Sequence, residues 1–115
     1  SVAAGAVHAP QATTMRFAGW RFDRVQRELV SPQGVMVALS GAEVRLLTAL
    51  TESAGRVLSR AALVERAASP GATERSVDLA VSRLRAKLGD DPRMPQLIRT
   101  QRGEGYLFTP KVDAS

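Results

Sequence analysis

The chain has 115 residues, which is enough for one compact domain and too few for two. It contains no cysteine and no apolar stretch near the roughly 20 residues that span a bilayer, so disulfides, thiolate metal sites and a membrane span are excluded and a cytoplasmic protein is expected. Lys and Arg number 16 against 11 Asp and Glu, a formal net charge of +5, which favours a polyanionic partner.

The N-terminal segment, residues 1–14, is rich in Ala, Gly, Thr and Pro and has no hydrophobic periodicity. This composition predicts a flexible tail or the remnant of an interdomain linker. The folded domain is expected to span residues 15–110, with residues 111–115 as a C-terminal tail. From Met15 to Leu39, short apolar runs are interrupted by the turn sequences AG and SPQG, which is typical of three or four antiparallel strands.

Two helices are predicted after these strands. The sequence LSGAEVRLLTALTESAG has apolar residues at helical spacing, Ser40 and Glu43 have the spacing of a capping box, and Gly55 is placed to end the helix. The sequence VLSRAALVERAAS predicts a short second helix with Ser59 as its N-cap residue. The GRVL sequence between the two helices predicts a strand fragment.

The sequence ERSVDLAVSRLRAKLGD predicts a third helix, which begins after Thr73. On a helical wheel that starts at Arg75, the apolar residues form a stripe between about 180° and 240° that is expected to face the core: Val77, Val81, Leu84 and Leu88. The opposite side, between about 340° and 80°, carries small residues, one leucine and two arginines: Arg75, Leu79, Ser82, Arg83 and Ala86. Small residues beside arginines let a helix approach a surface closely, as a helix in the major groove of DNA must.

Two interpretations of that exposed side stay open: a DNA-contacting face, on which Leu79 touches a thymine methyl group, or an ordinary solvated basic face. The arginine-rich composition is equally compatible with phosphate binding and with a GC-rich genome. On the flanks of the wheel lie Arg85 and Lys87, at about 280° and 120°. Asp78 is a candidate ion-pair partner for a nearby arginine.

A hairpin is predicted at the C-terminal end, where the alternating sequences LIRTQR and YLFTP are separated by GEG. Arg99, Thr100 and Tyr106 supply donors for phosphate or minor-groove contacts. The alternative is a plain surface hairpin in which Tyr106 and Phe108 only pack. A short helix, a longer basic helix and a glycine-tipped hairpin, in this order, predict an α+β winged helix-turn-helix fold.

These motifs resemble the OmpR/PhoB-type winged-helix domain, the DNA-binding effector half of two-component response regulators. The resemblance covers roughly Phe17 to Thr109 through LSGAEVRLLTAL, GRVLSRAALVERA, RSVDLAVSRLRAKLGDDP and LIRTQRGEGYLF. It implies an N-terminal antiparallel sheet, three helices and a C-terminal β-hairpin wing. It also implies sequence-specific DNA binding for transcriptional regulation, with a recognition helix at about 73–88 in the major groove and the wing at about 97–109 on the backbone or minor groove.

The expected DNA-binding residues come from this resemblance and from the helical wheel. They are Arg75, Ser76, Leu79, Ser82, Arg83, Arg85, Thr100, Arg102 and Tyr106. Within this set Arg83 is the expected base reader, and Arg75 and Arg85 are expected phosphate or ion-pair partners. Many relatives have His where this chain has Ala80, and some have Arg in place of Ser82, so two potential contacts are missing here.

The resemblance implies partners as well. Double-stranded DNA with tandem half-sites is expected, bound by a homodimer of the full-length protein. A receiver domain, phosphorylated by a sensor kinase, is expected before this chain, and a stand-alone regulator is the alternative. RNA polymerase is an expected partner of the loop after the second helix, although this loop departs from the family pattern. The loop residues are Ser69, Pro70, Gly71, Ala72 and Thr73.

An enzyme is the rival class of function. The only histidine is His8, in the tail, and neither G-x-S-x-G nor a phosphate-binding loop occurs, so no catalytic, cofactor or metal site is expected. Asp90 and Asp91 precede Pro92, where acidic residues are typical of turns rather than of a metal site. The other alternative is a winged helix that docks on proteins without sequence-specific DNA binding, whose third helix would carry large apolar anchors.

Overall fold

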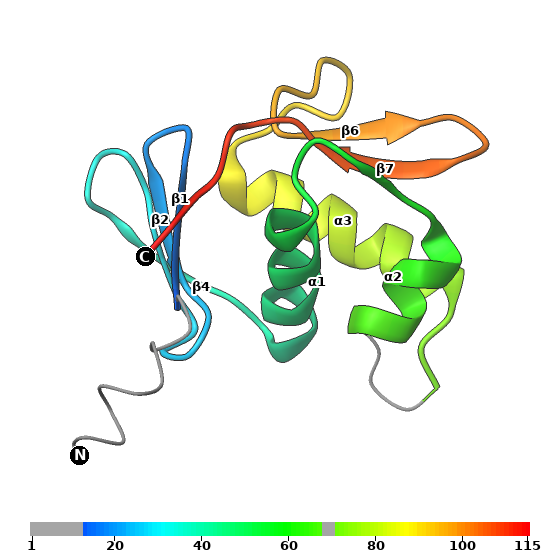
Figure 1. Cartoon of the computed structure of the whole chain (residues 1–115), viewed down its shortest axis with the longest axis horizontal. Helices are drawn as coiled ribbons and strands as arrows, with labels where there is room; N and C mark the ends of the chain where they lie inside the picture. Colours follow the sequence, from blue (N-terminus) through cyan, green and yellow to red (C-terminus); the bar gives the residue numbers. More distant parts are fainter. Residues whose placement is uncertain (1–12, 68–70) are drawn as a thin grey trace, which may run out of the picture.

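The computed structural model describes residues 13–67 and 71–115 of the chain. In Figure 1 an antiparallel sheet lies at the left, helices lie at the centre and right, and a β-hairpin runs along the top. In chain order the N-terminal strands come first, three helices follow with a short strand between the first two, and the hairpin comes after the third helix. This order confirms the predicted α+β winged helix-turn-helix fold.

The N-terminal sheet has five antiparallel strands in the order β4-β3-β2-β1-β8. The strands are β1 Thr14–Phe17, β2 Trp20–Asp23, β3 Glu28–Val30, β4 Met36–Ala38 and β8 Asp113–Ala114. One row of side chains across three strands is buried in the core, namely Met15, Phe22 and Leu29. Because successive side chains of a strand face opposite sides, the neighbouring Arg16 and Arg21 are exposed.

Both ends of the predicted domain differ from expectation. The prediction of a tail at residues 111–115 is corrected, because Asp113 and Ala114 form β8 and pair with β1. A two-residue strand carries no periodic side-chain signal, so its sequence reads as a tail. At the other end, Arg24 N donates to Thr13 O at 3.1 Å, so the end of the predicted tail 1–14 belongs to the sheet. The rest of that segment, residues 1–12, lies outside the described residues.

The three helices are α1 Gly41–Glu52, α2 Arg60–Ala67 and α3 Glu74–Leu88. The predicted capping box of α1 is confirmed, because Ser40 Oγ accepts from Glu43 N and a Glu43 carboxylate oxygen accepts from Ser40 N. Helix α3 begins after Thr73 as predicted and ends at Gly89, which has the left-handed conformation that favours glycine. None of the helices in the described residues combines the length and the apolar character needed to cross a membrane.

The connection from α1 to α2 follows the predicted pattern except at the end of α1. Helix α1 ends at Glu52 with Ser53 as its C-cap residue, so Gly55, which was expected to end the helix, lies in the turn that follows, with a φ of 82°. The predicted strand fragment is β5 (Val57–Leu58). Ser59 Oγ accepts a hydrogen bond from Ala62 N at 3.0 Å, which supports Ser59 as the N-cap residue of α2.

The core joins the sheet, the helices and the hairpin. Its largest fully buried side chains are Phe22, Leu29, Leu46, Leu47, Leu50, Leu63, Val81, Leu84, Ile98 and Phe108. Burying a side chain of this kind stabilises the fold by about 1.5–3 kcal/mol. The predicted apolar stripe of α3 is confirmed, because Val77, Val81, Leu84 and Leu88 are all buried. Phe17 and Phe108 pack edge to face at 4.9 Å between ring centroids, which joins the sheet to the hairpin.

The wing is the hairpin of β6 (Ile98–Gln101) and β7 (Gly105–Phe108), with β5 paired to the other edge of β7. Gly105 is the residue that allows this close pairing. Its φ is 144°, and a Cβ atom there would lie 2.0 Å from the backbone oxygen of Leu58. No other residue type fits at the start of β7 without moving β5.

Asp90 joins the end of α3 to the start of the wing. Its side chain is buried, and its carboxylate accepts hydrogen bonds from the backbone amides of Gln96, Leu97 and Ile98 at 2.6–3.2 Å. The sequence pattern indicated a turn-forming residue here and carried no sign of this anchoring role. This one side chain thus provides hydrogen-bond acceptors for three backbone amides.

Candidate nucleic-acid interface

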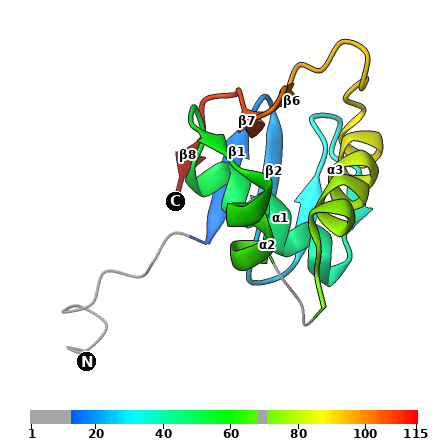
Figure 2. The same cartoon turned by 90° about the vertical axis from the view of Figure 1, so that its right-hand side faces the viewer.

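Helix α3 lies at the edge of the molecule and leaves one side open to solvent. Figure 2 shows α3 along the right-hand edge of the chain. The side opposite the buried stripe is exposed in the structure, as the helical wheel predicted, and consists of Arg75, Leu79, Ser82, Arg83 and Ala86. We call these five residues the open face of α3. Leu79 is 50 % exposed and is the one large apolar side chain on this face.

Four exposed arginines lie on or near this face and the wing: Arg75, Arg83, Arg99 and Arg102. Within residues 13–67 and 71–115, none of the four guanidinium groups has a hydrogen bond or an ion pair. A guanidinium without an internal partner keeps all five of its donors for an external acceptor. The open face and the wing therefore present positive charge that nothing in the described protein neutralises.

Arg85 has a different environment from the one expected for a DNA-binding residue. It is only 9 % exposed, and its guanidinium donates to Ile98 O at 3.0 and 2.7 Å and to Thr100 Oγ1 at 2.9 Å. Its guanidinium carbon also lies 5.7 Å from the ring centroid of Tyr106, a cation–π distance. Because the side chain is buried and the donors on Nε and Nη2 are engaged within the fold, we do not propose Arg85 as a DNA contact.

Ser76 is exposed, but its hydroxyl serves the start of α3. Ser76 Oγ donates to Thr73 O at 2.7 Å and accepts from Thr73 N at 2.7 Å, while Ser76 N donates to Thr73 Oγ1. These bonds form a capping box in which serine takes the place of the usual acidic residue. The hydroxyl proton of Ser76 is thus committed within the helix, and a contact to DNA by that proton is not available.

Tyr106 is 6 % exposed, and its hydroxyl donates to Asp78 Oδ1 at 2.5 Å. Burial, followed by the hydrogen bond to Asp78, raises the pKa of the Tyr106 hydroxyl, which keeps the phenol protonated as a donor. Its hydroxyl is therefore directed at α3 rather than at solvent. We remove Tyr106 from the expected DNA contacts for the same reason as Arg85.

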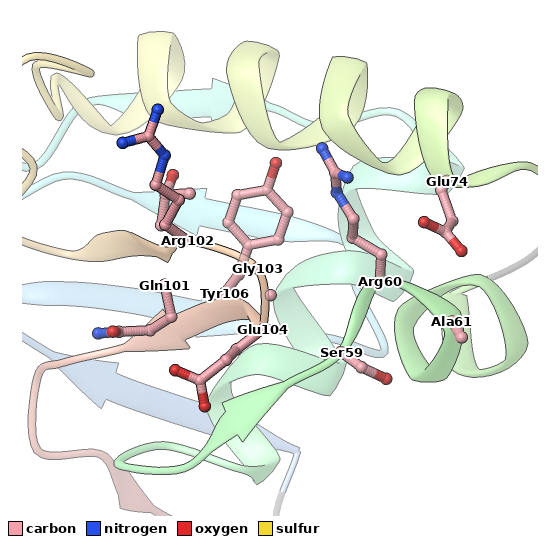
Figure 3. Close-up of a pocket in the computed structure, with 11 residues that line it drawn as sticks. Ser59, Arg60, Ala61, Glu74, Gln101, Arg102, Gly103, Glu104 and Tyr106 are labelled. Carbon is pink, nitrogen blue, oxygen red and sulfur yellow. The ribbon is translucent and has the colours of Figure 1, made fainter.

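Asp78 has the arginine partner that the sequence predicted, and the partner is Arg60 at the start of α2. Arg60 Nε donates to Asp78 Oδ1 at 3.0 Å and Nη2 donates to Oδ2 at 2.6 Å. These hydrogen bonds raise the pKa of Arg60. In Figure 3 the side chains of Arg60 and Tyr106 both point toward α3. Sequence reasoning missed Arg60, because a helical wheel of α3 cannot show which neighbouring helix approaches it.

A groove of about 460 Å³ separates the wing from the starts of α2 and α3. Its charged lining residues are Arg60, Glu74, Arg102 and Glu104 (Figure 3). Thr100 also lines the groove, and since Thr100 Oγ1 accepts from Arg85, its hydroxyl proton remains free to donate. The two signs of charge argue against a small-anion site in the groove itself.

Lys87 lies on the other flank of α3 and forms an ion pair. Its ammonium donates to a carboxylate oxygen of Glu43, which is 4 % exposed, in the first turn of α1. Burial by itself would raise the pKa of Glu43, but the hydrogen bonds from Lys87 and Ser40 outweigh burial and lower it. The C-terminal end of α3 is thereby joined to the N-terminal end of α1.

The loop expected to face RNA polymerase is described only in part. Ser69 and Pro70 lie outside the described residues. Gly71 is exposed with a φ of 83°, Ala72 is half-buried, and the Thr73 hydroxyl caps α3. Of the described residues of this loop, Gly71 and Thr73 are exposed.

Three helices followed by a hairpin wing define the chain as a winged helix-turn-helix domain. Residues 34–108 match the family described as transcriptional regulatory protein, C terminal. The chain belongs to this family, whose members include the OmpR/PhoB-type C-terminal domains.

Two curated relatives illustrate the similarity. The regulatory protein VirG of Agrobacterium fabrum strain C58 is 43 % identical over 101 residues, which cover 86 % of this chain and 40 % of VirG. The transcriptional regulatory protein AruR of Pseudomonas aeruginosa is 41 % identical over 96 residues, which cover 82 % of this chain and 39 % of AruR. The chain thus spans about 40 % of the length of these relatives.

Solved structures agree with the fold. The RstA DNA-binding domain of Klebsiella pneumoniae, in complex with the RstA box, is 39 % identical with a TM-score of 0.74, over 84 % of this chain and 96 % of that domain. The response regulator DrrB of Thermotoga maritima, an OmpR/PhoB homologue, is 31 % identical with a TM-score of 0.75, over 84 % of this chain and 44 % of DrrB.

Proposed function

We propose that this domain binds double-stranded DNA sequence-specifically and acts as the effector domain of a cytoplasmic transcriptional regulator. The observation that carries the proposal is the set of unpartnered arginines on the open face of α3 and on the wing. DNA carries one negative charge per about 1.7 Å of helix axis, so such a surface gains affinity from each phosphate that it neutralises. The likeness to the RstA domain, which is bound to the RstA box, supports the same partner here.

Helix α3 is the proposed recognition helix in the major groove. Arg83 is an exposed residue of the open face whose guanidinium has no partner among the described residues, and it suits bidentate contact with O6 and N7 of a guanine. Leu79 is the proposed contact to a thymine methyl group, and Ser82 is small enough to let the helix approach the base edges. Arg75, near the start of the helix, is the proposed phosphate contact of this face.

The wing is proposed to contact the DNA backbone or the minor groove. Arg102 at the tip and Arg99 on β6 are exposed cations without internal partners. Thr100 completes the set, because its free hydroxyl proton can be donated to a phosphate oxygen. These three contacts would fix the orientation of the domain on the duplex without reading its sequence.

The proposal extends to the full-length protein. We propose that a receiver domain, phosphorylated by a sensor kinase, precedes this domain in the full-length protein. We also propose that the full-length protein binds tandem half-sites as a homodimer and contacts RNA polymerase through residues 69–73. These proposals are supported by the family and by relatives of which this chain spans about 40 %. Dimerisation through a second domain would raise the effective concentration of two winged helices at adjacent half-sites.

Selection of binding sites from a pool of random duplexes tests the proposal directly. We expect enrichment of a motif of a few base pairs, since each mismatched base pair in a specific site costs about 1–3 kcal/mol. The selected duplex should then bind on the order of 100-fold more tightly than a scrambled duplex of the same composition. If no motif is enriched, or if an enriched duplex binds no more tightly than its scrambled version, sequence-specific recognition is refuted. A winged helix that docks on proteins would then be favoured.

A further inference from the structure

Two oppositely charged residues of α3 reach the wing from one side of the helix. Asp78 and Arg85 are seven residues apart, which is about two helical turns, so their side chains leave α3 on the same side about 10 Å apart. This side lies between the buried stripe and the open face. Both side chains bind neighbouring elements: Asp78 binds α2 and β7, and Arg85 binds β6.

The two residues hold both strands of the wing. Arg85 donates to Ile98 O and Thr100 Oγ1 on β6, and its guanidinium faces the ring of Tyr106 on β7. Asp78 accepts the hydroxyl proton of the same Tyr106 at 2.5 Å. One tyrosine is therefore held at its hydroxyl by a carboxylate and at its ring by a guanidinium, both from α3.

These contacts meet at a single position along the hairpin. Thr100 and Tyr106 lie directly opposite each other in the register of β6 and β7. Arg102, at the tip, is two residues beyond Thr100, or about 7 Å at the rise of an extended strand. A short hairpin that is held at this position has its tip placed at a set distance from α3.

Asp78 is itself held from a third element. Arg60 of α2 binds both of its oxygens, so Asp78 Oδ1 accepts from Tyr106 and Arg60 together while Oδ2 accepts from Arg60 alone. This two-point contact restricts rotation of the carboxylate. The tyrosine hydroxyl consequently meets an acceptor whose position is fixed by α2 and α3 jointly.

We infer that Asp78 and Arg85 are positioning residues for DNA binding, which hold the wing at the distance from the open face that lets Arg102 and Arg83 engage one duplex together. The inference rests on the proposed DNA-binding function and adds two residues that act without touching DNA. Its consequence is energetic coupling. The contribution of Arg102 to affinity depends on Arg85 and on the Tyr106 hydroxyl, whereas the contribution of Arg83, on α3 itself, does not.

A double-mutant cycle on this chain tests the inference. The variants are Arg85→Met, which keeps an apolar side chain of similar length, and Tyr106→Phe, which keeps the ring and removes the hydroxyl. Each is combined with Arg102→Ala and with Arg83→Ala, and affinity for the selected duplex is measured over a range of salt concentrations. Arg93→Met is the matched control, since it removes the same charge from an arginine whose side chain is 93 % exposed.

In the wild-type background, Arg102→Ala should flatten the log–log salt slope by about 0.9, the value for one phosphate contact. In the Arg85→Met and Tyr106→Phe backgrounds we expect most of that change in salt slope to vanish. The factor by which Arg102→Ala weakens binding should become at least about twofold smaller, which is the lower end of coupling for interacting residues. Arg83→Ala should cost the same factor in every background. The Arg93→Met background should leave both effects unchanged.

Equal effects of Arg102→Ala in all folded backgrounds would overturn the inference, even where the wild type binds DNA as proposed. A wild type without salt-dependent DNA binding would instead overturn the proposed function. Thermal unfolding of each variant identifies any that fails to fold. If Arg85→Met does not fold, the Tyr106→Phe background by itself tests the inference, because this substitution removes one hydrogen bond and leaves the ring in place.

Discussion

The ammonium of Lys87, in the last turn of α3, donates a hydrogen bond to the buried carboxylate of Glu43, in the first turn of α1. Together with the Asp78 and Arg85 contacts on the opposite flank, this pair holds α3 from both sides, while the buried stripe anchors it from behind. The open face has no side-chain hydrogen bond or ion pair within the described residues. The contacts that hold α3 in place therefore involve none of the arginines of the open face. Those arginines remain available for DNA.

Lys87→Met should destabilise the domain at neutral pH by about 1–3 kcal/mol, because the buried Glu43 carboxylate loses its charged partner. The pKa of Glu43 is lowered in the folded state, so its contribution to stability is full above its ordinary pKa and is lost as pH falls through the lowered value. The difference between wild type and variant should thus narrow below about pH 4. Urea unfolding of both proteins between pH 3 and 7 measures this difference in the free energy of unfolding.

Lys111→Met is the control for this prediction, since Lys111 is exposed near the C-terminal end of the chain. It should change the free energy of unfolding by less than about 0.5 kcal/mol at every pH. A Lys87→Met effect that stays constant from pH 7 to pH 3 would contradict the assignment of the stabilisation to the Glu43 charge.

Arg102→Ala should weaken binding to all duplexes by a similar factor and flatten the log–log salt slope by about 0.9. The reason is that an unpartnered arginine at the tip of the wing is placed to contact phosphate, which is the same at every sequence. Fluorescence anisotropy with the selected and the scrambled duplex provides the comparison. A loss confined to one base position of the site would mean that Arg102 reads a base.

Gly105→Ala should destabilise the domain by more than about 3 kcal/mol, because the new Cβ atom would lie 2.0 Å from Leu58 O and push β7 away from β5. Gly103→Ala is the matched comparison at the tip of the same hairpin. Gly103 also has a positive φ, of 76°, but a Cβ atom added there would meet no other atom within 4 Å, so only a backbone cost of about 1–2 kcal/mol is expected. Equal losses for the two variants in urea unfolding would show that the close approach to β5 is unimportant.

Asp90→Asn should cost about 1–3 kcal/mol of folding free energy, since an amide nitrogen would replace one of the oxygens that accept from backbone amides of the wing. Asp91→Asn, at the adjacent exposed position, should cost less than about 0.5 kcal/mol. Hydrogen exchange at the amides of Leu97 and Ile98 reports the effect locally. Unchanged protection of these amides in Asp90→Asn would contradict the anchoring role.

The sequence predicted the elements whose signals are local. The capping box at Ser40, the start of α3 at Thr73, the strand fragment before Ser59 and the wing hairpin all follow from residue types at short spacings, and the structure has each of them. The buried and open sides of α3 also followed from spacing alone, because a helix of known period that packs on a core can bury only one stripe.

Contacts between distant segments did not follow from these signals. The wheel placed Arg85 on a flank of α3, but whether a flank meets solvent, DNA or the wing depends on a hairpin that begins 13 residues later. For the same reason the sequence assigns Tyr106 to DNA and Asp90 to a turn, and it gives Lys87 a place on the other flank without a partner. Tyr106 and Lys87 contact residues that only the tertiary fold brings near, namely Asp78 and Glu43, and Asp90 binds backbone amides six to eight residues later in the chain.

The affinity of Arg83→Ala for the selected duplex and for a scrambled duplex tests the central claim most directly, namely that the open face of α3 reads base sequence. We predict a loss of about 1–3 kcal/mol on the selected duplex, a clearly smaller loss on the scrambled duplex and relaxed selectivity at one base-pair position. Circular dichroism should show the same thermal unfolding as the wild type, because Arg83 is exposed and has no partner in the described chain. An equal loss on both duplexes would contradict the claim and reduce Arg83 to a phosphate contact.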